Sequence, residues 1–373
     1  MRNLLAVALV GLAVATAEEQ DYPDGSKGVC RNVRWSGGDS IDWPCAVTEQ
    51  LYKSSNKFIG KNMLSTRTAV YDDTAFLAFP RLKSGIPFTL AKVSLRSKGC
   101  EASITPFPCW SLQEEGNCAA LQSVVDVFLD SYGILWALDT GIVDSLDCPV
   151  RRCSPKVVAI NARTGKVVKT IDLSPLTTDR SRLQYVVADY AENGHVFIYV
   201  SDAASRAVLV FDVTSGRGYR VILPKAVTSG AARLDVLSLA LIRRPDGTSC
   251  LLFTYFSGSN LFSIKTTYLQ SGQANGKVND LGPKKGKVVF LGTDNGSAIF
   301  FRREGESDIY RWDLLDCPTK ENILKVYKGK KCELPTHVVP DYNRSRMRVL
   351  ESNFPDFFQG TVGCGANHAL NIF

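Results

Sequence analysis

The stretch SVVDVFLDSYG at residues 123–133, followed directly by ILWALDTG at residues 134–141, decides the fold. Two runs rich in apolar and β-branched residues flank a turn that contains Asp130 and Gly133. Aspartate caps its own backbone in such turns and glycine accepts a positive φ angle, so the pattern predicts a β-hairpin. The same pattern recurs along the chain, and the repeat is more informative than any single motif.

Five further hairpins of this kind can be found in the sequence. They read TRTAVYDD with TAFLAFPR (66–81), LQYVVADYAENG with HVFIYVSD (183–202), VLSLALIRRPDG with TSCLLFTYF (236–256), VVFLGTDNG with SAIFFRRE (288–304), and THVVPDYNRSR with MRVLESNF (336–354). The turn aspartates of all six hairpins are Asp72, Asp130, Asp189, Asp246, Asp294 and Asp341, at spacings of 58, 59, 57, 48 and 47 residues.

A third apolar run follows most of these hairpins, and some blocks add a fourth, such as GKVVKTIDL at 165–173. Six blocks of about 50 residues with three to four short strands each predict an all-β fold, a six-bladed β-propeller over residues 62–373. A pair of β-sandwiches is the alternative, but sandwiches do not predict six regularly spaced aspartate turns. The segment 18–61 is less regular, contains a short helix near 47–58, and is expected to wrap or close the propeller.

Composition and charge limit the class of protein. The chain has 373 residues, of which 45% are hydrophobic and 22% charged, and this excludes a disordered or collagen-like protein. The net charge of +7 is a mild excess for this length and predicts no nucleic-acid partner.

The N-terminus predicts the compartment. Arg2 precedes an apolar run at 4–14 and the small residues Ala15, Thr16 and Ala17, which is the pattern of a secretory signal peptide over residues 1–17. The run is too short to span a bilayer. We therefore expect a secreted, extracellular protein with no membrane segment.

The cysteines agree with this compartment, because all 11 lie after residue 17. An odd number leaves at least one thiol free or joined to another molecule. Three pairs are close enough in sequence to close short loops: Cys30–Cys45, Cys109–Cys118 and Cys317–Cys332. With only three histidines, far apart in sequence, we expect neither a metal site nor a cofactor.

Propeller geometry sorts the loops onto two faces. We name the strands of each blade A to D, with A lining the central channel. The sequons at Asn295 and Asn343 both fall in A–B turns, so glycans there project from one face. The opposite face carries the B–C and D–A loops and is expected to be open to a ligand. Its candidate residues include Phe79, Arg81 and Gln184, and such a mixture suits a small polar aromatic molecule or an amine.

Several stretches resemble the Yellow and major royal jelly protein family of insects. They are AFLAFPRLKSGIPFTLAKV (75–93), DVFLDSYGILWALDTGIV (126–143), VFIYVSDAASRAVLVFDVTSGRGYRV (196–221) and RVLESNFPDFF (348–358). The resemblance extends over roughly residues 62–373, and LWALDTG and SDAASRAVLVFD are its most specific parts. Cys109, Cys118 and Cys364, with the stretch CWSLQEEGNCAALQ at 109–122, resemble the Yellow-g branch in particular.

The resemblance implies a secreted six-bladed propeller with a ligand pocket at one end of its channel. Carried over by position, it adds Asp139, Thr140, Asp202, Asn353 and Phe354 to the pocket candidates. The chain departs from the family pattern near the pocket, where Arg311 stands for a cysteine. The family also implies a disulfide between Cys100 and Cys153.

Family members differ in function, and three hypotheses follow. The first is a non-catalytic component of an extracellular covering such as eggshell or cuticle, with extracellular matrix proteins as partners. The second is a dopachrome-converting enzyme of melanin synthesis. In that case Asp139 or Asp202 is the base, and Asn353 or Arg81 donates a hydrogen bond to the developing oxyanion. The third is a binding protein for biogenic amines. The alternative role for both aspartates is to cap their own turns.

Overall fold

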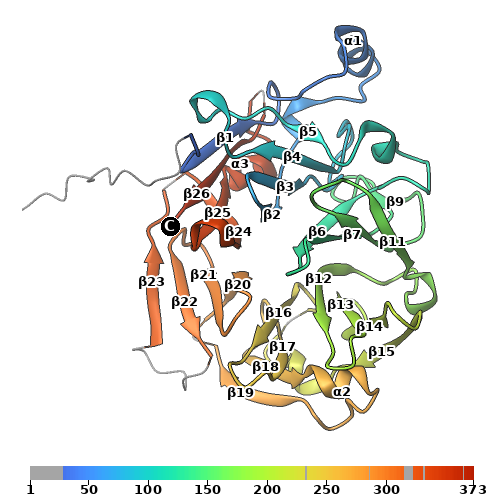
Figure 1. Cartoon of the computed structure of the whole chain (residues 1–373), viewed down its shortest axis with the longest axis vertical. Helices are drawn as coiled ribbons and strands as arrows, with labels where there is room; N and C mark the ends of the chain where they lie inside the picture. Colours follow the sequence, from blue (N-terminus) through green and yellow to red (C-terminus); the bar gives the residue numbers. More distant parts are fainter. Residues whose placement is uncertain (1–27, 232, 285, 315–321, 331, 364) are drawn as a thin grey trace, which may run out of the picture.

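The computed structural model of the chain describes residues 28–231, 233–284, 286–314, 322–330, 332–363 and 365–373. Six four-stranded antiparallel sheets stand around a common axis, as Figure 1 shows, and the predicted six-bladed β-propeller is confirmed. A pair of β-sandwiches is excluded, since the sheets are arranged radially rather than face to face in two layers. The predicted signal peptide at residues 1–17 lies outside the described residues.

The first three blades follow one another along the chain, with a small hairpin inserted in the second. Blade 1 contains β2 (Arg67–Tyr71), β3 (Thr74–Ala78), β4 (Leu90–Ser94) and β5 (Thr105–Pro106). Blade 2 contains β6 (Val124–Leu129), β7 (Ile134–Asp139), β10 (Lys156–Asn161) and β11 (Val167–Asp172), and its inserted hairpin is β8 (Ile142–Val143) with β9 (Val150–Arg151). Blade 3 contains β12 (Leu183–Tyr190), β13 (Val196–Asp202), β14 (Ala207–Asp212) and β15 (Arg217–Ile222).

The last three blades complete the ring. Blade 4 contains β16 (Leu237–Arg243), β17 (Ser249–Tyr255), β18 (Asn260–Lys265) and β19 (Asn279–Pro283). Blade 5 contains β20 (Val288–Thr293), β21 (Ala298–Arg303), β22 (Ile309–Asp313) and β23 (Ile323–Tyr327). Blade 6 contains β24 (Leu334–Asp341), β25 (Arg346–Ser352), β26 (Asn367–Ile372) and β1 (Asn32–Ser36). The α-helices are short: α1 (Ala46–Ser54), α2 (Thr266–Gln270) and α3 (Phe354–Gln359).

Both faces of each blade are apolar because each blade packs between two others. In β7, Leu135 and Ala137 join a core cluster shared with blade 1, whereas Trp136 and Leu138 join the cluster shared with blade 3. The strand therefore reads as a continuous apolar run rather than as an alternating one. The innermost strands β2, β6, β12, β16, β20 and β24 contact one another around the axis and form the wall of the channel.

Three of the six turn aspartates cap their own turns as the sequence predicts. Asp130 Oδ1 accepts hydrogen bonds from the backbone N–H groups of Tyr132 (2.9 Å) and Ile134 (3.0 Å), and Asp294 and Asp246 cap their turns in the same way. Two of the six aspartates, Asp189 and Asp341, lie in the last two positions of the inner strand rather than in the turn itself.

The ring is closed by the N-terminal segment. Strand β1 pairs with β26 and so supplies the outermost strand of blade 6. On the A–B face, Arg344 of blade 6 forms ion pairs with Asp341 (3.0 Å) and with Asp73 of blade 1. Helix α1 stands outside the ring, as Figure 1 shows, and ends at Ser54.

The disulfides differ from those expected. Cys100 and Cys153 are both bonded, but Cys100 pairs with Cys30 and Cys153 pairs with Cys118, so the predicted Cys100–Cys153 bridge is wrong. The reason is the position of β1, which brings Cys30 beside the end of β4 in blade 1. The short-loop pairings are also wrong for Cys45 and Cys109, which are exposed free thiols. Cys332 is free as well, and Cys317 lies outside the described residues.

Helices of the length and apolar character needed to cross a membrane are absent from the described ranges.

Candidate functional site

The axial channel is wide at one end and narrow inside. At the A–B face, a cavity of about 470 Å³ is lined by residues of the A–B turns and by the last residues of the inner strands, among them Tyr71, Phe128 and Tyr342. It shares Phe128, Asn295 and Tyr342 with a smaller inner cavity of about 80 Å³ that continues along the axis. We call the first cavity the mouth and the second the inner cavity. Gly292 is needed here, because a side chain on it would place a Cβ 1.9 Å from the Val338 carbonyl oxygen.

Four polar side chains form the far wall of the inner cavity. Asp126, Tyr185, His337 and Thr68 line it, from β6, β12, β24 and β2. The neighbouring Arg67 holds this group together. Its Nε lies 3.2 Å from Asp126 Oδ1, its Nη1 donates to the Thr336 carbonyl oxygen (2.9 Å), and its guanidinium lies 4.7 Å from the centre of the Tyr185 ring. The Arg67 side chain is only 15% exposed. We call Arg67 and the four lining residues Thr68, Asp126, Tyr185 and His337 the floor of the inner cavity.

Burial sets the protonation of this floor. It raises the pKa of Asp126 to about 6, although the charge of Arg67 and the N–H groups of Val186 and Val127 act in the other direction. Burial, together with the charge of Arg67, holds the pKa of His337 well below its ordinary value. His337 Nδ1 accepts the backbone N–H of Thr68 (3.1 Å), so the neutral ring carries its proton on Nε2.

One polar atom in the inner cavity is left without a partner. The Thr68 side chain is fully buried, and its Oγ1 has no hydrogen bond within the described part of the chain. Buried hydroxyl groups are ordinarily satisfied, so this one is available to a molecule in the cavity.

The charges at the mouth are largely compensated. Asp72 pairs with Arg163 (3.1 Å), and Asp130 Oδ2 accepts hydrogen bonds from Trp136 Nε1 and Tyr190 Oη (both 2.7 Å). Each of these two carboxylates therefore has an ionic or hydrogen-bonding partner, and the cationic Arg243 also lines the mouth. This environment suits a neutral polar ring better than a cation.

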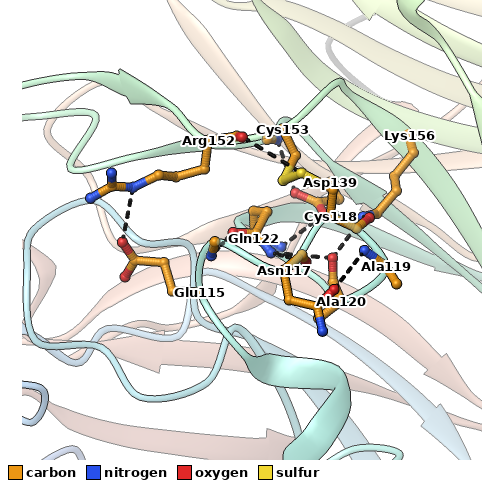
Figure 2. Close-up of a disulfide and its surroundings, with 12 residues drawn as sticks. Glu115, Asn117, Cys118, Ala119, Ala120, Gln122, Asp139, Arg152, Cys153 and Lys156 are labelled. Carbon is orange, nitrogen blue, oxygen red and sulfur yellow. Dashed lines mark hydrogen bonds and ion pairs between the residues drawn. A yellow bond between two sulfur atoms is a disulfide. The ribbon is translucent and has the colours of Figure 1, made fainter.

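The sequence-predicted residue Asp139 lies elsewhere, at the end of β7, and is fully buried. Figure 2 shows it beside the Cys118–Cys153 disulfide and Lys156. Its Oδ1 accepts the N–H groups of Ser123 (2.8 Å) and Gly141 (2.9 Å), and its Oδ2 accepts that of Gln122 (2.8 Å). These are the contacts of a carboxylate that organises a turn.

Arg81 and Thr140 contact the same segment, 121–123, so the structure brings them close to Asp139. Arg81 is 2% exposed, and its guanidinium donates to the carbonyl oxygens of Leu121 (3.1 Å), Gln122 (2.5 Å) and Gln113 (2.6 Å). The Thr140 hydroxyl donates to the Ser123 carbonyl oxygen (3.4 Å).

Asp202 and Gln184 belong to blade 3 and are not part of that group. Asp202 is fully buried and accepts the hydroxyl groups of Ser181 (2.7 Å) and Ser205 (2.5 Å). Burial raises its pKa, but these hydroxyls and two backbone N–H groups prevail, and the net effect is a lowered pKa. Gln184 Oε1 accepts the N–H of Leu237 (2.8 Å) and so links blade 3 to blade 4.

The remaining predicted residues lie near the end of the chain or in the core. Phe79 is fully buried against Phe88, with ring centroids 5.6 Å apart. Asn353 precedes α3, and its side chain contacts Asn367 and Asp356. Phe354 packs against Phe358, at 4.7 Å between centroids.

The structure thus brings Arg81, Asp139 and Thr140 together but separates this group from the other predicted residues. None of the eight lies in the wall of the mouth or of the inner cavity: Phe79, Arg81, Asp139, Thr140, Gln184, Asp202, Asn353 and Phe354. Their roles in catalysis and ligand binding stay predictions. The expected ligand face also differs from the face with the wide opening, since the mouth lies among the A–B turns.

The floor residues were missed, although the sequence carried a signal for them. Thr68, Asp126, Tyr185 and His337 each stand four residues before a turn aspartate, so they occupy equivalent positions in four repeats. Polar residues at one repeated position of an inner strand lie at one level of the channel.

Both sequons lie where the sequence predicts, in A–B turns. Asn295 lies between β20 and β21 and lines both the mouth and the inner cavity. Asn343 lies between β24 and β25 and lines the mouth.

The family model "Major royal jelly protein" matches residues 122–369. "Dopaminechrome tautomerase" of Drosophila melanogaster is 27% identical over 169 residues, which cover 44% of this chain and 36% of that protein. "Protein yellow" of Drosophila yakuba is 22% identical over 248 residues, which cover 61% of this chain and 46% of that protein. The chain thus matches less than half the length of these curated relatives.

A solved structure of regucalcin from Agrobacterium tumefaciens superposes with a TM-score of 0.48 at 15% identity. The match covers 83% of this chain and 90% of the bacterial one.

Proposed function

Because the chain belongs to the major royal jelly protein family, we propose that it is a secreted propeller that binds a small polar aromatic molecule in its axial channel. The observation that carries this proposal is the pair of adjoining cavities, mouth and inner cavity, which share Phe128, Asn295 and Tyr342 and lead toward the polar floor. In this account the protein binds its ligand without converting it.

The dimensions of the channel support a ligand of one or two rings. A cavity of roughly 150 Å³ holds benzene, so the mouth of about 470 Å³ has room for fused rings, whereas the inner cavity of about 80 Å³ admits only a substituent or the edge of a ring. Phe128 and Tyr342 flank the passage between the two. Hydroxyl or carbonyl groups of the ligand can reach the unpartnered Thr68 hydroxyl and the His337 Nε2–H.

The compartment and the tissue are also part of the proposal. The signal-peptide pattern at 1–17, the two disulfides and the sequons at Asn295 and Asn343 support an extracellular glycoprotein. The resemblance to the Yellow-g branch supports a place in eggshell or cuticle, and the exposed thiols of Cys45, Cys109, Cys148 and Cys332 offer links to matrix proteins.

Calorimetric titration with 5-hydroxyindole, a stable neutral probe, tests the binding. We expect saturable binding that weakens about tenfold in Thr68→Val and His337→Phe, since each substitution removes one hydrogen-bonding group of the cavity. Absence of saturation, or binding that both variants leave unchanged, would refute the proposed site. Dopamine serves as the comparison probe, and tight binding of dopamine alone would favour an amine-binding protein instead.

Catalysis is the second candidate, because Asp126 and a neutral His337 line the same cavity and one relative is named a dopaminechrome tautomerase. In such an isomerisation the Asp126 carboxylate takes a proton from a ring carbon, while His337 Nε2–H donates a hydrogen bond to the quinone oxygen that gains the electron pair. That oxygen then receives a proton, so the product is an isomer and no oxidant or reductant is needed.

The decay of dopaminechrome absorbance separates the two candidates. Saturable acceleration by the wild type, lost in Asp126→Asn and retained in the folded Asp139→Asn and Asp202→Asn variants, would establish an enzyme with its base in the channel. Loss in Asp139→Asn or Asp202→Asn alone would support the sequence-predicted aspartates. No acceleration leaves a binding protein.

A further inference from the structure

We propose that Asn295 is an N-glycosylation site whose glycan covers the mouth and limits the rate at which ligand enters and leaves the channel, whereas a glycan on Asn343 does not. The effect on ligand exchange rests on the proposed function. The position of the glycan over the mouth does not.

The side chain of Asn295 is placed across the mouth. Its residue has a φ of 58° in the A–B turn of blade 5, and its Nδ2 donates a hydrogen bond to the Tyr342 hydroxyl of blade 6. Both residues line the mouth and the inner cavity, and the Tyr342 side chain is 54% exposed. The nitrogen that would carry a sugar therefore lies at the opening of the channel, over the boundary between two blades.

Asn343 has a different orientation, although it belongs to the neighbouring turn. Its Nδ2 donates to Asp72 Oδ1 of blade 1 (3.1 Å), away from Asn295. Asn343 lines the mouth but not the inner cavity. The chain thus contains two sequons on one face that differ in their relation to the channel, and the second provides a matched control.

The modification needs one co-reactant, a lipid-linked oligosaccharyl diphosphate. Asn295 Nδ2 loses one proton and forms a bond to the anomeric carbon of the sugar, and the lipid diphosphate leaves with the electrons of the broken carbon–oxygen bond. The nitrogen keeps one hydrogen, so it can still donate to Tyr342. The first sugar then lies beside the exposed face of the Tyr342 ring.

A cover over the mouth acts on rates rather than on affinity. If the glycan does not contact the bound ligand, it slows entry and exit by the same factor, and the equilibrium constant is unchanged. We take the mouth as the route of exchange, since the nearly buried Arg67 packs against Asp126 on the side of the inner cavity away from the mouth, and we expect removal of the glycan to raise both rates about fivefold.

The test uses the full chain secreted from insect cells, with the variants Ser297→Ala and Ser345→Ala. Each removes one sequon but keeps its asparagine, so the Asn295–Tyr342 and Asn343–Asp72 hydrogen bonds remain. Glycopeptide mass spectrometry reports occupancy. Nitration by tetranitromethane reports access to Tyr342, with the 70% exposed Tyr132 as the internal reference. Stopped-flow mixing with 5-hydroxyindole reports the exchange rates.

We expect occupancy at Asn295 in the wild type, severalfold faster nitration of Tyr342 in Ser297→Ala only, and faster association and dissociation of 5-hydroxyindole in that variant only. An unoccupied Asn295, or equal nitration of Tyr342 in the wild type and both variants, overturns the proposal. If Tyr342 is nitrated faster in Ser297→Ala but the exchange rates of 5-hydroxyindole are equal in all three proteins, the glycan covers the mouth without controlling ligand exchange, and that part of the proposal is refuted. Failure of 5-hydroxyindole to bind any variant refutes the proposed function, and nitration still decides the position of the glycan.

Discussion

Replacing Asp139 with asparagine distinguishes a turn-forming carboxylate from a catalytic one. The asparagine oxygen keeps the bonds from Ser123 and Gly141, but its amide group faces the N–H of Gln122, which loses an acceptor at 2.8 Å. A buried donor left without an acceptor costs roughly 1–3 kcal/mol. Lys156 also loses a carboxylate 3.6 Å away, although it keeps two carbonyl oxygens. We expect a total loss of about 2–4 kcal/mol in the free energy of unfolding.

Thermal unfolding measures this loss. With an unfolding entropy of roughly 2 cal/mol/K per residue, a chain of 373 residues loses about 3–5 °C in Tm for that change. The same preparation, assayed below its Tm, is expected to bind 5-hydroxyindole with unchanged affinity. Asp126→Asn is the matched comparison. It keeps the size of the side chain in the channel, removes the charge beside Arg67, and is expected to change the affinity about tenfold.

The reverse pattern would refute this reasoning. If Asp139→Asn leaves Tm unchanged but abolishes binding or turnover, then Asp139 contacts the ligand and the site lies at the B–C face. If Asp126→Asn has no effect on binding, the floor of the inner cavity is not part of the site.

Three further outcomes are expected. The double variant Cys118→Ser, Cys153→Ser removes a disulfide that joins residues 35 positions apart, and it is expected to reduce the free energy of unfolding by about 4 kcal/mol. Denaturant unfolding measures this loss, and an unchanged transition midpoint would contradict a native Cys118–Cys153 bridge. Arg344→Ala removes one cationic partner of Asp341 at the boundary between blades 6 and 1, and it is expected to lower the free energy of unfolding by about 3 kcal/mol. A variant with the same Tm as the wild type would show that Arg344 does not stabilise the closure of the ring. The pKa of Asp126 is raised from 3.8 to about 6, so the native state keeps a proton that the unfolded state releases. As the pH rises from 4 to 6, the free energy of unfolding of the wild type is therefore expected to fall by about 2 kcal/mol more than that of Asp126→Asn; parallel pH profiles would contradict this.

The fold could be predicted because its determinants are local and repeated. The aspartate turn between two apolar runs specifies a hairpin, and six copies at regular spacing specify radial stacking. The role of β1 was harder to foresee, because the strand NVRWS at Asn32–Ser36 has no repeat partner in the sequence and acquires its place only by pairing with β26. The disulfide error follows from this, since Cys30 arrives beside Cys100 with that strand.

The site was harder to predict than the fold. Asp139 and Asp202 were predicted as site residues because each ends a stretch that resembles the family. A carboxylate at the end of a strand is, however, also well placed to accept hydrogen bonds from the free N–H groups of the next turn. Asp126 and His337 lie inside apolar strands, where a polar residue faces the channel only because the blades close into a ring. Their common position before the turn aspartates was visible in the sequence, but which end of the channel is wide depends on the packing of Arg67 and Tyr185.

A crystal structure of the secreted protein soaked with 5-hydroxyindole tests the central claim most directly. We expect a ring in the mouth between Phe128 and Tyr342, with its hydroxyl group directed toward Thr68 and His337. Density for the probe at the B–C face beside Asp139 or Asn353, with the channel unchanged, would contradict it.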